Sequence, residues 1–204
     1  PVWENSYTLY KNDVKIAPNS AKLNYHYGLE VSKRADDAQN ATEKQQLYTE
    51  GMTHLQKAVE LYPQYHDAYG RIGLTYYRQK NYQEALKNYD LAIKYKSNNA
   101  LVYSNMGTLY FEIKNIDKAK EAYQKSVDAD PRFTDGWRNL GSLNAQTGNF
   151  PAAIKAFQEA LKYAPNDATV NFYLGSAYLD SGNESAGRPY LNRAYQLNPN
   201  LPKK

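Results

Sequence analysis

The chain of 204 residues has no cysteine, only three histidines and no long apolar run. Without cysteine there can be no disulfide, no thiolate nucleophile and no thiolate metal ligand. No window approaches the roughly 18 apolar residues of a membrane helix, so we expect no bilayer span. No serine has the Gly-x-Ser-x-Gly setting, and no glycine-rich loop precedes a Lys-Ser or Lys-Thr pair. We therefore expect no catalytic site, metal or cofactor here.

An excess of charge of one sign is also missing. The 25 basic and 21 acidic side chains give a net charge of +4, and both signs are mixed along the whole sequence. A protein that follows a phosphate backbone needs a basic stripe, so we expect no nucleic-acid partner. The carboxylates, such as Asp36, Asp37 and Glu43, are expected on solvated helix faces.

Tyrosine, by contrast, is abundant, with 21 residues against five phenylalanines and two tryptophans. A tyrosine can bury its ring and keep its hydroxyl in water. Many half-buried rings favour a thin structure with little deep interior.

A 34-residue period runs through the sequence. Glycines recur at this spacing, and a small residue follows each one after twelve positions. The glycines are Gly73, Gly107, Gly141 and Gly175, and the small residues are Ala85, Ala119, Ala153 and Gly187. A large residue follows four positions later, at Tyr89, Tyr123, Phe157 and Leu191. Apolar spacings of three and four predict helices, and turn signals such as Lys80-Asn81 and Gly148-Asn149 separate them.

This pattern resembles the tetratricopeptide repeat, with its Trp-x2-Leu-Gly-x2-Tyr start followed by Ala, Phe, Ala and Pro. The segment from Trp137 to Gly141 and the segment from Ala153 to Pro165 carry the pattern closely. The resemblance implies an all-α, right-handed superhelical solenoid of about five helix hairpins with an extra N-terminal helix. It also implies a scaffold that binds a protein or peptide.

The period divides the chain into a lead-in and five repeats. Tyr27-Gly28 and Gly51 mark a first repeat whose two glycines lie 23 residues apart, where the others have 12. The eleven extra residues, around 34–48, contain no Gly or Pro, so we expect longer helices. The predicted parts are residues 1–20, 21–65, 66–99, 100–133, 134–167 and 168–204.

Two end segments need separate treatment. In the lead-in, Tyr10 and Pro18 fall where a second helix has its aromatic and its proline, so we predict a covering helix over residues 3–16, beginning at Trp3. In the last repeat, Pro189 falls within the predicted second helix. Either that helix begins late, near Ser185, or it bends at the proline.

In the resembled family the first helices line a concave groove, and six positions of each repeat face it. The candidate binding residues on these positions are Arg71, Tyr77, Arg78, Asn105, Phe111, Arg138, Asn139 and Ser142. Asn105 and Asn139 share one position in consecutive repeats, and an amide can pair with a peptide backbone of any sequence. They look like two rungs of the asparagine ladder of the O-linked N-acetylglucosamine transferase. The carboxylate clamp known from chaperone-binding repeats lacks its flanking cations here, and we reject it.

Residues 3–10 and 16–22 resemble the start of the repeat region in transmembrane, tetratricopeptide-containing O-mannosyltransferases and their bacterial relatives. That resemblance implies the soluble, extracytoplasmic or periplasmic tail of a membrane protein, attached to the membrane only by sequence outside this chain. The alternative is a free-standing cytoplasmic protein whose repeats serve a structural role, with self-association through the last repeat.

Overall fold

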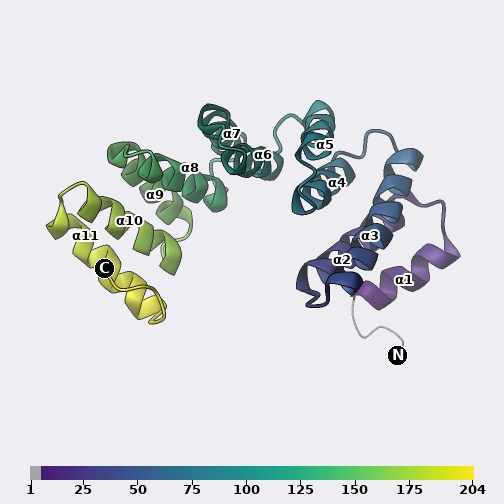
Figure 1. Cartoon of the computed structure of the whole chain (residues 1–204), viewed down its shortest axis with the longest axis horizontal. Helices are drawn as coiled ribbons and strands as arrows, with labels where there is room; N and C mark the ends of the chain where they lie inside the picture. Colours follow the sequence, from purple (N-terminus) through teal and green to yellow (C-terminus); the bar gives the residue numbers. More distant parts are fainter. Residues whose placement is uncertain (1–5) are drawn as a thin grey trace. The chain divides into compact units, whose positions relative to one another are not determined.

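The computed structural model describes residues 6–204, which form eleven α-helices and no strand (Figure 1). The chain divides into two compact units, one ending at Ser97 and the other beginning at Asn98. The first unit contains α1 Ser6–Ile16, α2 Ala21–Asp37, α3 Ala41–Leu61, α4 His66–Arg78 and α5 Tyr82–Tyr95. The second contains α6 Ala100–Glu112, α7 Ile116–Ala129, α8 Thr134–Gln146, α9 Phe150–Tyr163, α10 Ala168–Asp180 and α11 Glu184–Leu197. Within each unit the helices pack as successive antiparallel pairs, which confirms the predicted all-α fold.

The four later pairs repeat the same dimensions, a first helix of 13 residues and a second of 14. The same residue type begins each of these second helices. At Asn81, Asn115, Asn149 and Asn183 the side-chain oxygen accepts a hydrogen bond from the backbone N–H three residues on. This N-cap satisfies a backbone donor that would otherwise lack a helical partner. The asparagine after each turn therefore fixes where its helix begins.

The turn before each asparagine needs a left-handed backbone. The φ angles are +60° at Lys80, +63° at Lys114, +76° at Gly148 and +83° at Gly182. At the first turn the Asn81 N–H donates to the Tyr76 carbonyl at 2.9 Å, which closes the helix end. Glycine adopts this conformation without strain, whereas a residue with a Cβ is strained there.

We expect Lys80→Gly and Lys114→Gly each to raise the free energy of unfolding by about 0.5–1 kcal/mol. The gain is the relief of left-handed strain, less the extra entropy of glycine in the unfolded chain. Urea unfolding followed by circular dichroism measures it. Lys80→Ala is the control, because it removes the lysine side chain and keeps the strain. An equal gain in that control would contradict the explanation.

The first repeat accommodates its insertion by lengthening both helices, as predicted. Helix α2 has 17 residues and α3 has 21, with only residues 38–40 between them. The extension is tied down at its base, because the Tyr48 hydroxyl donates to Asp36 at 2.9 Å and Asp36 also forms an ion pair with Arg78 of α4. The expectation of a solvated Asp36 is therefore wrong: the longer helices bring this carboxylate against the next helix pair.

The lead-in forms helix α1, and Trp3, its predicted first residue, lies outside the described residues. Val14 of α1 is buried in one cluster with Tyr27 and Val31 of α2, and Tyr7 packs against them. Helix α1 thus packs against α2 and covers the N-terminal end of the first helix pair. Within residues 6–204, no helix is both long and apolar enough to cross a bilayer.

The interior of the second unit is a series of small clusters between neighbouring helices. Tyr123 and Leu140 belong to one cluster and Phe157 and Leu174 to the next, while the Trp137 ring packs against both. At the far end, α11 begins at Glu184 and continues through Pro189 to Leu197. The helix therefore begins one residue before the expected late start near Ser185, and the proline lies within it.

Candidate functional site

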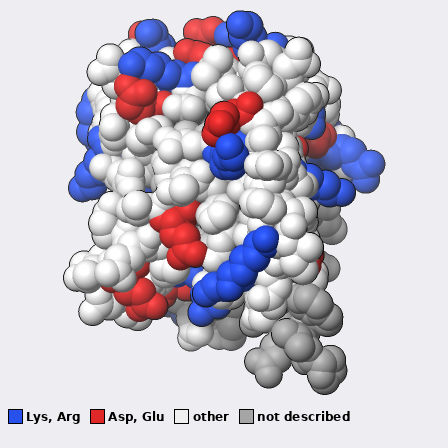
Figure 2. Space-filling view, turned by 90° about the vertical axis from the view of Figure 1, so that its right-hand side faces the viewer, with Lys and Arg blue, Asp and Glu red and all other residues white. Residues whose placement is uncertain are grey.

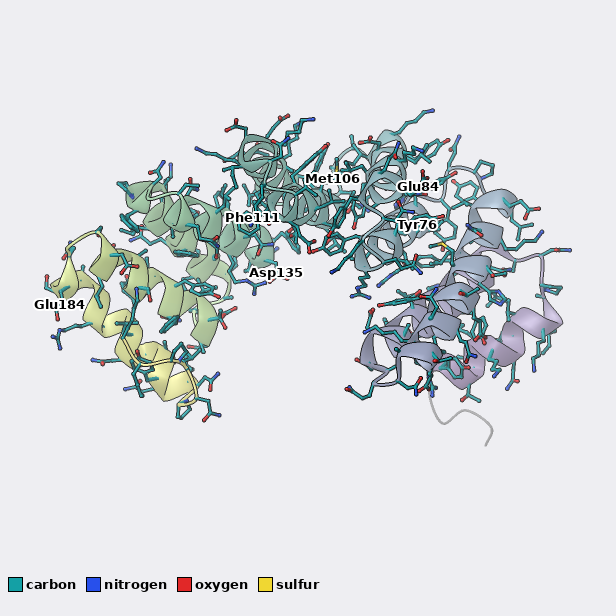
Figure 3. All side chains as sticks on the ribbon, in the orientation of Figure 1. Tyr76, Glu84, Met106, Phe111, Asp135 and Glu184 are labelled. Atoms are coloured by element: carbon teal, nitrogen blue, oxygen red, sulfur yellow. The ribbon has the colours of Figure 1, made fainter. Side chains whose placement is uncertain are left out.

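A pocket of about 180 Å³ lies between the first helices of two consecutive repeats in the second unit. Its lining residues come from α6, α7 and α8 and are Thr108, Phe111, Tyr123, Asn139, Ser142, Leu143 and Gln146. We call it the α6–α8 pocket. Figure 3 labels Phe111 near the end of α6 and Asp135 near the start of α8, the two helices that bound it. An apolar ring beside amide and hydroxyl groups suits a peptide side chain together with its backbone.

The wall of this pocket is held by hydrogen bonds. The Thr108 hydroxyl donates to the Ser104 carbonyl at 3.1 Å, and the Tyr123 hydroxyl lies 3.1 Å from the Thr108 oxygen. Burial raises the pKa of Tyr123, so this hydroxyl stays protonated and can donate. From α8, the Asn139 amide donates to the Ser104 hydroxyl at 3.0 Å. The polar groups around Phe111 are thus oriented by the fold.

Tyr89 holds the position of Tyr123 one repeat earlier, and its environment differs. Its side chain is 0% exposed, and its hydroxyl has no hydrogen-bond partner in the described part of the chain. The position that carries Thr108 in the next repeat carries Leu74 here. Two equivalent tyrosines therefore differ in one hydrogen bond.

We expect Tyr123→Phe to lower the free energy of unfolding by about 1 kcal/mol, because it leaves Thr108 without that bond. Tyr89→Phe removes a buried unpaired hydroxyl, so it is expected to leave stability unchanged or to raise it. Parallel urea titrations of both variants make the comparison. A loss at Tyr89 as large as that at Tyr123 would show that the Tyr89 hydroxyl has a partner in solution.

Of the predicted binding residues in the second unit, three line one pocket and the other two do not. Phe111, Asn139 and Ser142 meet in the α6–α8 pocket. The Arg138 guanidinium instead forms an ion pair with Asp135 of its own helix at 2.8 Å. Asn105 is half-buried on α6 and is not among the lining residues of this pocket.

The predicted residues of the first unit all lie on α4. Arg78 pairs with Asp36, and burial lowers the pKa of its guanidinium. The Tyr77 ring is half-buried, with its centroid 6.1 Å from that of Tyr82. Arg71 is half-buried as well, and in the described residues no hydrogen bond or ion pair reaches its guanidinium.

Sequence reasoning missed Tyr123 and Leu143 as pocket residues, since it considered only groove-facing positions of the first helices. A signal was present at Tyr123. A Cβ added to Gly107 would lie 2.5 Å from the Tyr123 ring, so the ring crosses the first helix where the small residue recurs. A large residue sixteen positions after each period glycine therefore packs against that glycine, and at Tyr123 its hydroxyl reaches the pocket wall.

The other polar clusters offer no metal site. In residues 6–204 no group of three or more histidine and carboxylate side chains is placed to hold a metal ion. His54 lies beside an amide, with Nδ1 2.8 Å from the Asn24 oxygen, and burial lowers the pKa of this imidazole. On the face shown in Figure 2, blue and red side chains are interspersed rather than gathered by sign.

Comparison with known proteins agrees with this architecture. A family model described as Tetratricopeptide repeat matches residues 105–161 and 145–202, and one described as TPR repeat matches residues 73–114. No curated protein matches the sequence.

Solved structures resemble the fold at low sequence identity. MamA from Desulfovibrio magneticus RS-1 is 17% identical, covering 90% of this chain and 97% of its own, with a TM-score of 0.66. YrrB, described as a TPR protein with an unusual peptide-binding site, is 18% identical, covering 94% of this chain and 93% of its own, with a TM-score of 0.65. PilF of Pseudomonas aeruginosa is 19% identical, covering 90% of this chain and 78% of its own, with a TM-score of 0.75.

These likenesses show the fold, and the family models together span residues 73–202, well over half of the chain. The period of 34 residues, the capped helix pairs and the glycine contacts agree with them. The chain belongs to the tetratricopeptide repeat family.

Proposed function

We propose that this chain is a non-catalytic scaffold that binds a peptide or helix of a partner protein on the face formed by its first helices. The observation that carries the proposal is the α6–α8 pocket, where side chains from two consecutive repeats converge. YrrB, whose fold is similar, is described as having an unusual peptide-binding site. That description supports a peptide ligand for this class of surface.

The chemistry of the pocket fits a peptide. Phe111 and Leu143 offer apolar contact to a side chain, while Ser142 and Gln146 can donate to or accept from a peptide backbone. The polar wall held by Tyr123 and Thr108 limits the rearrangement needed for binding, which reduces the entropy lost on association.

Selection of peptides from a random library displayed on phage, with the whole protein as target, tests this proposal. We expect the selected peptides to bind the double variant Phe111→Ala/Gln146→Ala at least tenfold more weakly than the wild type in fluorescence polarisation. The control is Lys120→Ala/Gln124→Ala, two exposed positions on α7, which should bind normally. Selected peptides that bind the pocket variant as tightly as the wild type would refute the site.

We also propose that the chain is the extracytoplasmic tail of a larger membrane protein resembling the O-mannosyltransferases. The support is the resemblance of residues 3–10 and 16–22 described above. The sequence preceding Pro1 in the source gene is the test. A series of membrane spans there is expected, and a cytoplasmic protein without such spans would overturn the assignment.

Self-association through the last repeat is the alternative function. Two contacts argue against it: Lys204 pairs with Asp180 at 2.7 Å, and Lys203 lies 4.0 Å from the centre of the Tyr195 ring. These side chains cover part of the surface that a second copy would need. Light scattering over a concentration series should therefore report a monomer, and a dimer would favour the alternative.

A further inference from the structure

We propose that the outer side of the last helix pair binds a non-helical segment of a partner protein that carries two adjacent lysines. Residues 202–204 of this chain occupy that site in the structure and act as its reversible cover. We call it the end site and define it by Phe172, Asp180 and Tyr195. It lies wholly within the second unit, on α10 and α11, and is independent of the α6–α8 pocket.

The position of Tyr195 normally faces the first helix of the following repeat. Val127 and Leu161 hold this position in the two preceding repeats. Val127 is buried in one cluster with Leu140 of α8, and Leu161 packs against the cluster that contains Leu174 of α10. Within residues 6–204 no helix follows α11. The Tyr195 ring is therefore left for a different kind of contact.

Phe172 belongs to the same surface. It holds the position of Ser104, whose hydroxyl accepts a hydrogen bond from Asn139 on the following first helix at 3.0 Å. The centroids of the Phe172 and Tyr195 rings lie 6.4 Å apart, with the ring planes inclined at 61°. Both side chains are only half-buried. They form an aromatic surface that a peptide can reach.

The Tyr195 hydroxyl binds the backbone of the covering segment at two points. It donates to the Pro202 carbonyl at 3.2 Å and accepts from the Lys204 N–H at 2.9 Å. Because a hydroxyl can donate and accept at the same time, one side chain holds both kinds of backbone group. This part of the contact does not depend on which side chains the bound segment carries.

The two lysines supply the specificity. The Lys203 ammonium lies 4.0 Å from the centre of the Tyr195 ring, within the range of a cation–π contact. The Lys204 ammonium donates to both carboxylate oxygens of Asp180, at 2.7 and 2.8 Å. In the described part of the chain no other cation pairs with Asp180. A ring face and a carboxylate side by side match two consecutive ammonium groups.

The covering segment is held weakly enough to be displaced. The side chains of Lys204 and Asp180 stay 37% and 47% exposed, and ion pairs at such exposure contribute little. Residues 202–204 compete mainly because they are tethered close by, at an effective concentration on the order of millimolar. A partner that adds further contacts beside its two lysines can therefore replace them.

A peptide with the sequence of residues 198–204, acetylated and amidated at its ends, tests the end site on the whole protein. Binding is followed by NMR at the amide signals of Asp180 and Tyr195. We expect Lys203→Ala/Lys204→Ala, which loosens the covering segment, to bind the peptide at least tenfold more tightly than the wild type.

Further changes in this opened variant identify the contacts. Asp180→Asn should weaken peptide binding at least fivefold and Tyr195→Phe at least threefold. Glu159→Gln is the matched control, because this carboxylate pairs with Lys162 on α9 and should not affect the peptide. The same peptide with both lysines replaced by glutamine should bind at least tenfold more weakly.

The outcomes separate the end site from the proposed function. The pocket variant Phe111→Ala/Gln146→Ala should leave binding of this peptide unchanged. The end site is overturned if the opened variant shows no saturable binding, or if Asp180→Asn leaves the binding as it was. A dimer in light scattering that Asp180→Asn abolishes would also overturn the proposal, because the segment of a second copy would then fill the site.

Discussion

Phe157→Ala is expected to lower the free energy of unfolding by about 3–5 kcal/mol. The Phe157 side chain is 1% exposed and lies at the centre of a cluster with Leu174 of α10. Its ring also fills the space over Gly141 of α8, where an added Cβ would lie 2.6 Å away. One side chain therefore joins three helices, and its removal leaves a cavity that none of them can close alone.

The loss should appear first around α8, α9 and α10, because repeats are stabilised mainly by their nearest neighbours. Trp137 packs against the Phe157 cluster, so its fluorescence, measured in a Trp3→Phe background, reports that region while circular dichroism reports all helices. Tyr163→Ala, at a position 45% exposed on the same helix, is the matched control and should change stability by less than about 0.5 kcal/mol. Equal losses in the two variants would contradict this account of the core.

Gly107→Ala is expected to cost about 2–3 kcal/mol, although alanine is the better helix former. The added Cβ would lie within 2.5 to 2.9 Å of three atoms of the Tyr123 ring. That ring is buried and its hydroxyl is held by Thr108, so it cannot swing aside cheaply. Thermal unfolding followed by circular dichroism should show a clear fall in Tm.

The double variant Gly107→Ala/Tyr123→Ala isolates the cause of this loss. Once the ring is gone, the alanine at 107 should cost nothing relative to Tyr123→Ala alone. A cost that persists in the double variant would assign the effect to the helix backbone instead of to the ring contact.

The fold was predictable because its determinants are local and repeated. The 34-residue spacing of glycine and small residues, with an asparagine after each turn, sets helix lengths and pairing. Even the helical form of the insertion around residues 34–48 could be predicted, because that segment contains no Gly or Pro. At Pro189 the pattern left two options, because a proline near a helix start is tolerated or disruptive according to its register.

The candidate site was predictable only in part, because side-chain partners depend on neighbouring repeats. Position alone put Phe111, Asn139 and Ser142 on one surface, and the structure brings these three side chains together in one pocket. It could not show that the insertion delivers Asp36 to Arg78 of the next pair. The pairing of Arg138 with Asp135, three residues before it on the same helix, is a local contact that positional reasoning left out.

The long first pair limits how this array can be rearranged. Pairs of 13 and 14 residues have matching lengths, so a 34-residue module can be duplicated or deleted while its flanks still fit one another. The pair of 17 and 21 residues cannot be exchanged in this way, because its Asp36 is matched to an arginine on the helix that follows. Evolutionary changes in length are therefore expected among the later modules, with the first kept beside its present neighbour.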